Sequence, residues 1–329
     1  MLKFSYRLGQ LLALCLGVML RAQAQPMPSP GEHLESLVTF GSQAKINMGD
    51  DDFLQTFFFL VPAKERRPFY IRVFDPDCGG TLDAKLGTFD TTTEFSLYAG
   101  PGNHSGPGAT DPRPTNTAQL PSGRLVKQQV FGVDPAYDGQ YYTFGPINPL
   151  EGELVSDFDG YVVKVVVRGL SGNDGNLYRF FLSTSPTENI PVPGGNAFTY
   201  EYGFRMPAAT PSGKPVTAHI YPFANEHVIS IRQNNFDSDG LVKLTIFSVA
   251  KNGHDAPVSA DGQWVNSVLP IVSQEHGLSL DFRLTTTATT FNDLVFFVTD
   301  QYDKALPFFA SPLGGIPKYK YDIDMKIHR

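Results

Sequence analysis

Apolar residues in this chain come in short runs that Gly, Pro, Asn and Asp interrupt, and long stretches with helical 3.6-residue periodicity are missing. Short runs rich in β-branched and aromatic side chains are typical of β-strands. Residues 162–167 hold five valines, which suit a pleated, largely buried strand. The pattern predicts strands at residues 57–61, 69–74, 95–98, 161–167, 177–182, 228–231, 241–247, 278–282 and 294–298.

A segment rich in proline and glycine divides these strands into two groups. Residues 186–195 contain three prolines and two glycines, which do not fit a strand ladder, so we interpret them as an interdomain linker. The predicted fold is all-β, with two antiparallel, jelly-roll-like β-sandwich domains in tandem at residues 25–185 and 196–329. Residues 100–123, rich in Gly, Pro, Thr and Asn, are predicted to form a long loop in the first domain.

The two halves contain a short stretch of similar sequence. Residues 59–63 and 204–208 each pair an apolar strand with Pro-Ala, and an Asp-rich turn follows in both cases. The spacing from the proline to that turn is 13 residues in the first half and 30 in the second. The sequence therefore suggests a duplication with an insertion in one half, and leaves it open.

The first 24 residues have the organisation of a secretory signal peptide. Lys3 and Arg7 precede an apolar run at 8–20, and the small residues of Ala22-Gln23-Ala24 suit a cleavage site. The apolar run is shorter than the roughly 20 residues that a membrane-spanning helix needs. We therefore predict a mature protein that begins near Gln25, has no transmembrane segment, and is periplasmic, cell-surface or secreted.

Cleavage there also changes the charge and the cysteine content. Loss of Lys3, Arg7 and Arg21 takes the formal net charge from −7 to −10. An acidic surface without an extended basic patch argues against nucleic-acid binding. Cys15 leaves with the signal, so Cys78 is alone and no intramolecular disulfide can form. Bound calcium is one way to stabilise such a protein instead.

Two Asp-rich turns are candidate calcium loops. The first contains Asp75, Asp77 and Asp83 around Cys78-Gly79-Gly80, and the acidic run 50–52 offers a further ligand. Alternating Asp positions place carboxylates on one side of a turn, and glycine lets backbone carbonyls turn inward. Calcium, with six to eight oxygen ligands, favours such an arrangement.

The second candidate loop contains Asn235, Asp237 and Asp239, followed by Gly240. It matches the first six positions of an EF-hand loop, but position 12 is Ile246 instead of Glu, so it is not an EF-hand. Asp-Gly and Asn-Gly sequences are also common in hairpin turns that bind no ion. Whether either loop binds calcium stays open at this point.

A short aromatic strand, an Asp-rich turn and the closing strand at residues 174–182 form a recognisable pattern. Over residues 57–182 it resembles the pre-peptidase C-terminal modules of secreted bacterial proteins, which are small calcium-stabilised β-sandwiches. The resemblance rests on the pattern and does not extend to the second half. It implies a non-catalytic accessory role.

No catalytic motif of a common enzyme class is present. The chain lacks Gly-x-Ser-x-Gly and His-Glu-x-x-His, and nothing singles out Glu94, Glu201 or Glu226 as a glycosidase carboxylate. Carbohydrate-binding sandwiches use aromatic side chains as stacking platforms. Clustered tyrosines in a Gly-rich segment are the candidates for that role: Tyr137, Tyr141 and Tyr142.

The sequence thus favours an exported, non-catalytic binding or adhesion protein with a polysaccharide or another cell-surface component as partner. Two alternatives stay open, a secreted hydrolase with a β-sandwich accessory domain and a structural subunit of a cell-surface assembly. Recognition would lie in the loops, because the sandwich is a scaffold.

Overall fold

The computed structural model describes residues 26–113 and 122–320 of the chain. The predicted signal peptide, residues 1–24, lies outside this range. Every strand pairing in the described residues is antiparallel, and helix is limited there to short 3₁₀ turns. The predicted all-β class is therefore confirmed.

The first half is a sandwich of two four-stranded layers in which the chain passes repeatedly from one layer to the other. One layer has the order β2 (Ser36–Phe40), β10 (Gly175–Ser183), β4 (Phe69–Phe74), β7 (Tyr141–Ile147). The other has the order β3 (Leu54–Pro62), β9 (Gly160–Ser171), β5 (Thr92–Ala99), β6 (Arg124–Phe131). This eight-stranded order is that of a jelly roll.

The second half repeats this topology strand for strand. Its first layer has the order β12 (Glu201–Met206), β21 (Asn292–Asp300), β15 (Ser230–Phe236), β18 (Trp264–Pro270). Its second has the order β13 (Val216–Ile220), β20 (Asp281–Thr286), β16 (Val242–Phe247), β17 (Asn252–Ala256). The fold is thus internally duplicated. The similar sequences at residues 59–63 and 204–208 lie at the ends of β3 and β12. The structural counterpart of β3 is β13, so this sequence similarity does not mark the structural repeat.

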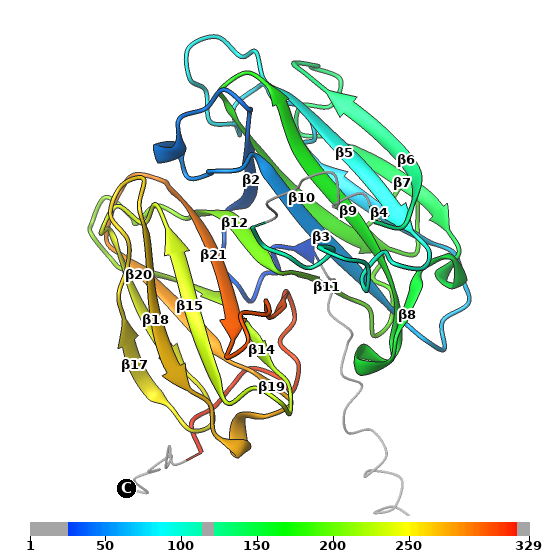
Figure 1. Cartoon of the computed structure of the whole chain (residues 1–329). Helices are drawn as coiled ribbons and strands as arrows, with labels where there is room; N and C mark the ends of the chain where they lie inside the picture. Colours follow the sequence, from blue (N-terminus) through cyan, green and yellow to red (C-terminus); the bar gives the residue numbers. More distant parts are fainter. Residues whose placement is uncertain (1–25, 114–121, 321–329) are drawn as a thin grey trace, which may run out of the picture.

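The two halves share a sheet. β12 pairs with β2, with Phe204 opposite Leu37 and Arg205 opposite Ser36, so the first layers join edge to edge into one continuous sheet (Figure 1). The strand order on one side of this central pair mirrors the order on the other. A second connection comes from β11 (Asn196–Thr199), which pairs with β3 of the first half and with β22 (Phe308–Phe309).

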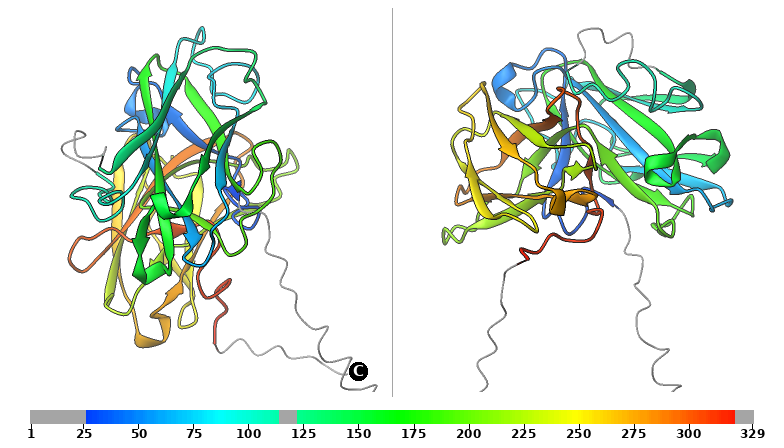
Figure 2. Two further views of the ribbon diagram at one scale, coloured as in Figure 1. Left: turned by 90° about the vertical axis from the view of Figure 1, so that its right-hand side faces the viewer. Right: turned by 60° about the horizontal axis from the view of Figure 1, so that its bottom comes forward.

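Short elements complete the described fold. They are β1 (Pro26–Met27), β8 (Glu153–Val155), β14 (Phe223–Ala224), β19 (Leu278–Ser279), η1 (Ile46–Met48), η3 (Pro149–Glu151), η4 (Ser156–Phe158) and η5 (Ser273–Glu275). The right-hand view of Figure 2 shows the two sandwiches side by side, with the blue N-terminal strands between them.

The hydrophobic core crosses the junction as well. One contiguous cluster of buried side chains includes Phe57 and Phe180 of the first half and Tyr202, Phe204 and Phe296 of the second. The segment predicted as a linker is also packed, because Val192 is fully buried in this cluster. Two independent tandem domains are therefore not confirmed, and the halves form one packed unit.

We expect the halves to unfold together because sheet and core are continuous. Phe204→Ala removes a fully buried ring that stacks on Phe296, and we expect it to lower the free energy of unfolding by about 3–5 kcal/mol. Urea denaturation should show one transition for both proteins, moved to lower urea in the variant. Val268→Ala, at a position that is 60% exposed on β18, is the control and should change stability little. Two separate transitions would contradict the shared core.

Candidate calcium turns and ligand groove

The first Asp-rich turn follows β4 directly and is fixed by backbone hydrogen bonds. Asp75 adopts a left-handed conformation, with φ 56°, and its Oδ1 accepts a 2.6 Å hydrogen bond from the Gly139 amide. Oδ2 of Asp77 accepts a 3.1 Å bond from the Asp134 amide. The other oxygens, Asp75 Oδ2 and Asp77 Oδ1, are buried and have no hydrogen-bond donor among the described residues. The turn thus holds two buried carboxylate oxygens that accept no hydrogen bond from the described residues.

Negative charge accumulates in this turn. Burial, and then the charges of Asp77 and Asp138, raise the pKa of Asp75 to about 6. Burial raises the pKa of Asp77 too, with a contribution from Asp138. A Cβ added to Gly80 would lie 2.2 Å from Oδ1 of Asp138, so Asp138 lies directly against this backbone. A cation would relieve the desolvation and the repulsion together.

Asp83, the third predicted ligand of this turn, accepts hydrogen bonds from two backbone amides. Its Oδ2 accepts from the Gly79 amide at 2.7 Å and its Oδ1 from the Leu177 amide at 2.6 Å. Asp83 thereby ties the turn to β10, and burial raises its pKa to about 8. Cys78 is a free, fully buried thiol whose pKa is raised by burial, which fits an inert packing residue.

The second Asp-rich turn occupies the equivalent position after β15. Asp237 also has φ 56°, and its Oδ1 accepts a 2.6 Å bond from the Gly262 amide, as Asp75 does from Gly139. Each of Asp237, Asp239 and Asp261 has a carboxylate oxygen within 4.8 Å of the others. Burial, and then the charges of Asp239 and Asp261, raise the pKa of Asp237 to about 6. The two repeats therefore carry equivalent aspartates, but among the described residues only the second turn brings three carboxylates within 4.8 Å of one another.

Asn235 does not belong to this group of oxygens. Its side chain is fully buried, where it accepts from the Ser259 amide at 2.9 Å and donates to Gln233 Oε1 and Pro257 O. Sequence reasoning missed Asp138 and Asp261. The signal was present in the repeated Asp-Gly-Gln at 138–140 and 261–263, each directly before the strand that pairs with the Asp-rich turn's own strand.

The three candidate tyrosines divide by environment. Tyr137 and Tyr142 pack against the main core and against the ring of Phe131, at centroid distances of 5.0 and 5.2 Å. Tyr141 is 37% exposed, its hydroxyl accepts a 2.8 Å bond from Asn189, and the Arg72 guanidinium lies 4.1 Å from its ring centroid. Of the three, only Tyr141 borders the groove described next.

This groove has a volume of about 440 Å³ and lies between the N-terminal segment 26–35 and the outer face of β10 and β7. Its polar groups are the side chains of His33, Glu35, Arg179 and Asn189, and Tyr141 supplies an aromatic wall. An aromatic wall with a few polar groups is the composition of a site for a small polar molecule or a chain segment.

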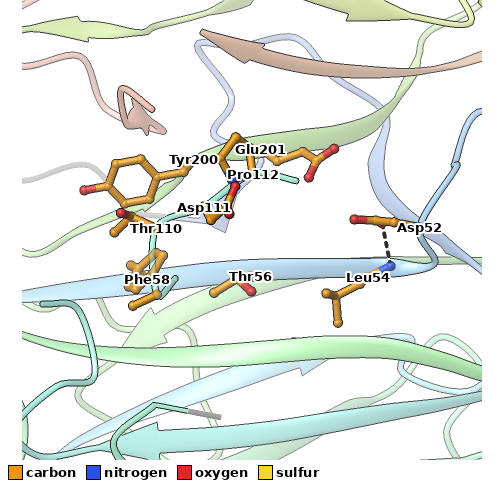
Figure 3. A pocket seen from close by; sticks show the side chains of 10 residues that line it. Asp52, Leu54, Thr56, Phe58, Thr110, Asp111, Pro112, Tyr200 and Glu201 are labelled. Atoms are coloured by element: carbon orange, nitrogen blue, oxygen red, sulfur yellow. Dashed lines mark hydrogen bonds between the residues drawn. The ribbon is translucent and has the colours of Figure 1, made fainter. Parts of the chain in front are cut away.

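A further set of carboxylates lies at the junction of the halves. Asp52, at the end of the acidic run, and Glu201, at the start of β12, point toward one another across a small cavity (Figure 3). The acidic run lies beside the second half, because Trp264 Nε1 donates a 2.9 Å bond to Asp51. The sequence named Asp50, Asp51, Asp52 and Glu201 separately, and only the fold brings them together.

Comparison with protein-family models and with curated proteins yields no match to this chain. Within the described residues, no helix has the length and apolar character needed to cross a membrane.

We expect Asp83→Asn to destabilise the protein to the same extent with and without calcium. The substitution places an amide where a carboxylate oxygen accepts from a backbone N–H, and the loss should be about 1.5–3 kcal/mol. Urea denaturation in EDTA and in calcium provides the measurement. A loss that appears only in calcium would instead make Asp83 an ion ligand.

Proposed function

We propose that this chain is an exported, non-catalytic binding or adhesion protein whose double β-sandwich is stabilised by calcium. The observation that carries the calcium part is the pair of buried oxygens of Asp75 and Asp77, which lie beside Asp138 and accept no hydrogen bond from the described residues. The equivalent turn supports it, because Asp237, Asp239 and Asp261 each have a carboxylate oxygen within 4.8 Å of the others. Oxygen-only donor sets of this kind suit calcium.

The groove beside Tyr141 supports the binding part of the proposal. A polysaccharide segment presents hydroxyl groups and apolar sugar faces, and the groove offers Arg179, Glu35 and Asn189 as hydrogen-bonding partners with Tyr141 as aromatic wall. We therefore propose a polysaccharide or another glycan of the cell surface as the ligand. The resemblance to pre-peptidase C-terminal modules agrees with a non-catalytic role outside the cytoplasm.

A secreted hydrolase is the second candidate, since Asp52 and Glu201 are two converging carboxylates. Their cavity measures about 20 Å³, which is room for a water molecule but far too little for a sugar ring. A glycosidase has to place the glycosidic bond between its two carboxylates. The geometry therefore favours the non-catalytic function.

Calcium should raise the thermal stability of the mature protein, because an ion that binds only the folded state shifts the equilibrium toward it. At a free concentration one hundred times Kd the gain per site is about 2.7 kcal/mol. We expect Asp75→Asn/Asp77→Asn to lose part of the rise in Tm between EDTA and millimolar calcium. Asp159→Asn is the matched control, because Asp159 is an exposed turn residue with φ 48°. Identical melting curves in EDTA and calcium for the wild type would refute calcium stabilisation.

Binding to immobilised polysaccharides should depend on the groove. We expect Tyr141→Ala and Arg179→Ala each to weaken the binding of a glycan found in a screen at least tenfold, because each removes one wall of the groove. Tyr302→Ala, which changes a tyrosine that is 72% exposed, should bind like the wild type. A screen without any binding would favour a structural subunit instead. The eight-residue edge strand β6, with Leu125, Val126 and Val130 exposed, would then be the surface for strand addition.

A further inference from the structure

The junction between the halves contains a buried carboxylate that accepts no hydrogen bond from the described residues. Glu201 is only 8% exposed, and no hydrogen-bond donor among the described residues reaches its carboxylate. Opposite it, Asp52 Oδ2 and Asp51 Oδ1 are buried and equally lack a donor among the described residues. An ionised group in such a place is costly unless another charge compensates it.

The unpartnered oxygens face a common space. Glu201 extends from β12 and Asp52 from the loop before β3 into the same cavity, and Figure 3 shows the two side chains directed toward one another. Thr56 and Asp111 also line this cavity, and residues 109–112 cover it. The volume of about 20 Å³ accommodates one water-sized particle.

The surroundings supply only part of the missing positive charge. Asp50 uses its carboxylate for the backbone amides of Phe40, Asp52 and Phe53. Arg113 forms a 2.7 Å ion pair with Asp51 Oδ2 and is the only cation in an ion pair with this cluster among the described residues. Four carboxylates therefore share one guanidinium. Burial, and then the charge of Asp52, raise the pKa of Glu201.

We propose that the cavity between Asp52 and Glu201 binds one calcium ion that joins the two halves. The available ligands are all oxygens, since Asp52, Glu201, Asp111 and Thr56 line the space and Asp51 lies within 4.8 Å of Asp52. Magnesium usually retains several waters of its own, which this space does not accommodate, whereas calcium accepts a flexible shell of carboxylate oxygens. The proposal is independent of the Asp-rich turns, which are separate groups of residues.

The ion would connect the two halves at the acidic cluster of the junction. Asp52 belongs to the first half and Glu201 to the first strand of the second, and the strands that follow or contain them, β3 and β12, contact one another. An ion bound by both would replace their repulsion with attraction. Calcium would then stabilise the junction that the shared sheet and core already form.

Trp264, the only tryptophan of the chain, is a built-in reporter because it hydrogen-bonds Asp51. The test uses terbium as a calcium substitute and measures its luminescence after selective tryptophan excitation. Asp261 is also close to Trp264 in sequence, so terbium bound at the second Asp-rich turn could give the same signal. The protein used in this test therefore carries Asp237→Asn/Asp239→Asn, which removes the carboxylate ligands of that turn. We expect sensitised terbium emission that calcium displaces, and at least tenfold weaker binding of both ions after Glu201→Gln.

Calorimetric titration with calcium gives the number of ions and separates this site from the turns. Glu201→Gln in the otherwise native protein should lower the stoichiometry by one ion, and Asp75→Asn/Asp77→Asn should leave the terbium signal unchanged. Glu226→Gln, at an exposed position, is the matched control. Circular dichroism checks folding, and Asp52→Asn replaces Glu201→Gln if the latter does not fold. An unchanged stoichiometry and terbium affinity would overturn the proposal and leave a proton shared by Asp52 and Glu201. That result would not contradict calcium binding at the two Asp-rich turns.

Discussion

The antiparallel pairing of β2 with β12 is the contact on which the rest of the structure depends. It converts two jelly rolls into one sheet with a mirrored strand order, and it aligns their cores into one cluster. A β-sheet edge carries unpaired amides and carbonyls, and these halves use each other to satisfy two such edges. The same pairing places Glu201, the first residue of β12, beside the acidic loop that precedes β3.

Buried negative charge is the recurring cost of this arrangement. In each repeat the strand β4 or β15 is followed directly by an Asp whose Oδ1 accepts a hydrogen bond from a glycine amide. Burial raises the pKa of both residues, Asp75 and Asp237. The junction adds Glu201 and Asp52. The described residues contain one free cysteine, Cys78, and no disulfide, so these oxygen sites are the places there where a bound ion would contribute most to stability.

Much of the fold was predictable because strand periodicity is local. The predicted run 69–74 coincides with β4, and most other runs fall inside observed strands. The run 278–282 was wrong as a single strand, since β19 and β20 divide it. The edge strand β17 escaped prediction because its exposed, mostly polar side chains lack the apolar pattern, and β6 escaped because Lys127, Gln128 and Gln129 interrupt its apolar residues. The linker reading of 186–195 missed that Val192 is buried in the core.

The sequence by itself determined the strand class, the acidic charge and the two Asp-rich turns, because each follows from composition or from residues that are close along the chain. Only the tertiary structure decided that Asp138 joins Asp75, that Asp261 joins Asp237, and that Tyr141 alone of three tyrosines borders a groove. It also decided that Glu201 faces Asp52 across 149 positions of sequence. Such encounters follow from strand pairing between distant segments, and no local pattern of residues encodes which edges meet.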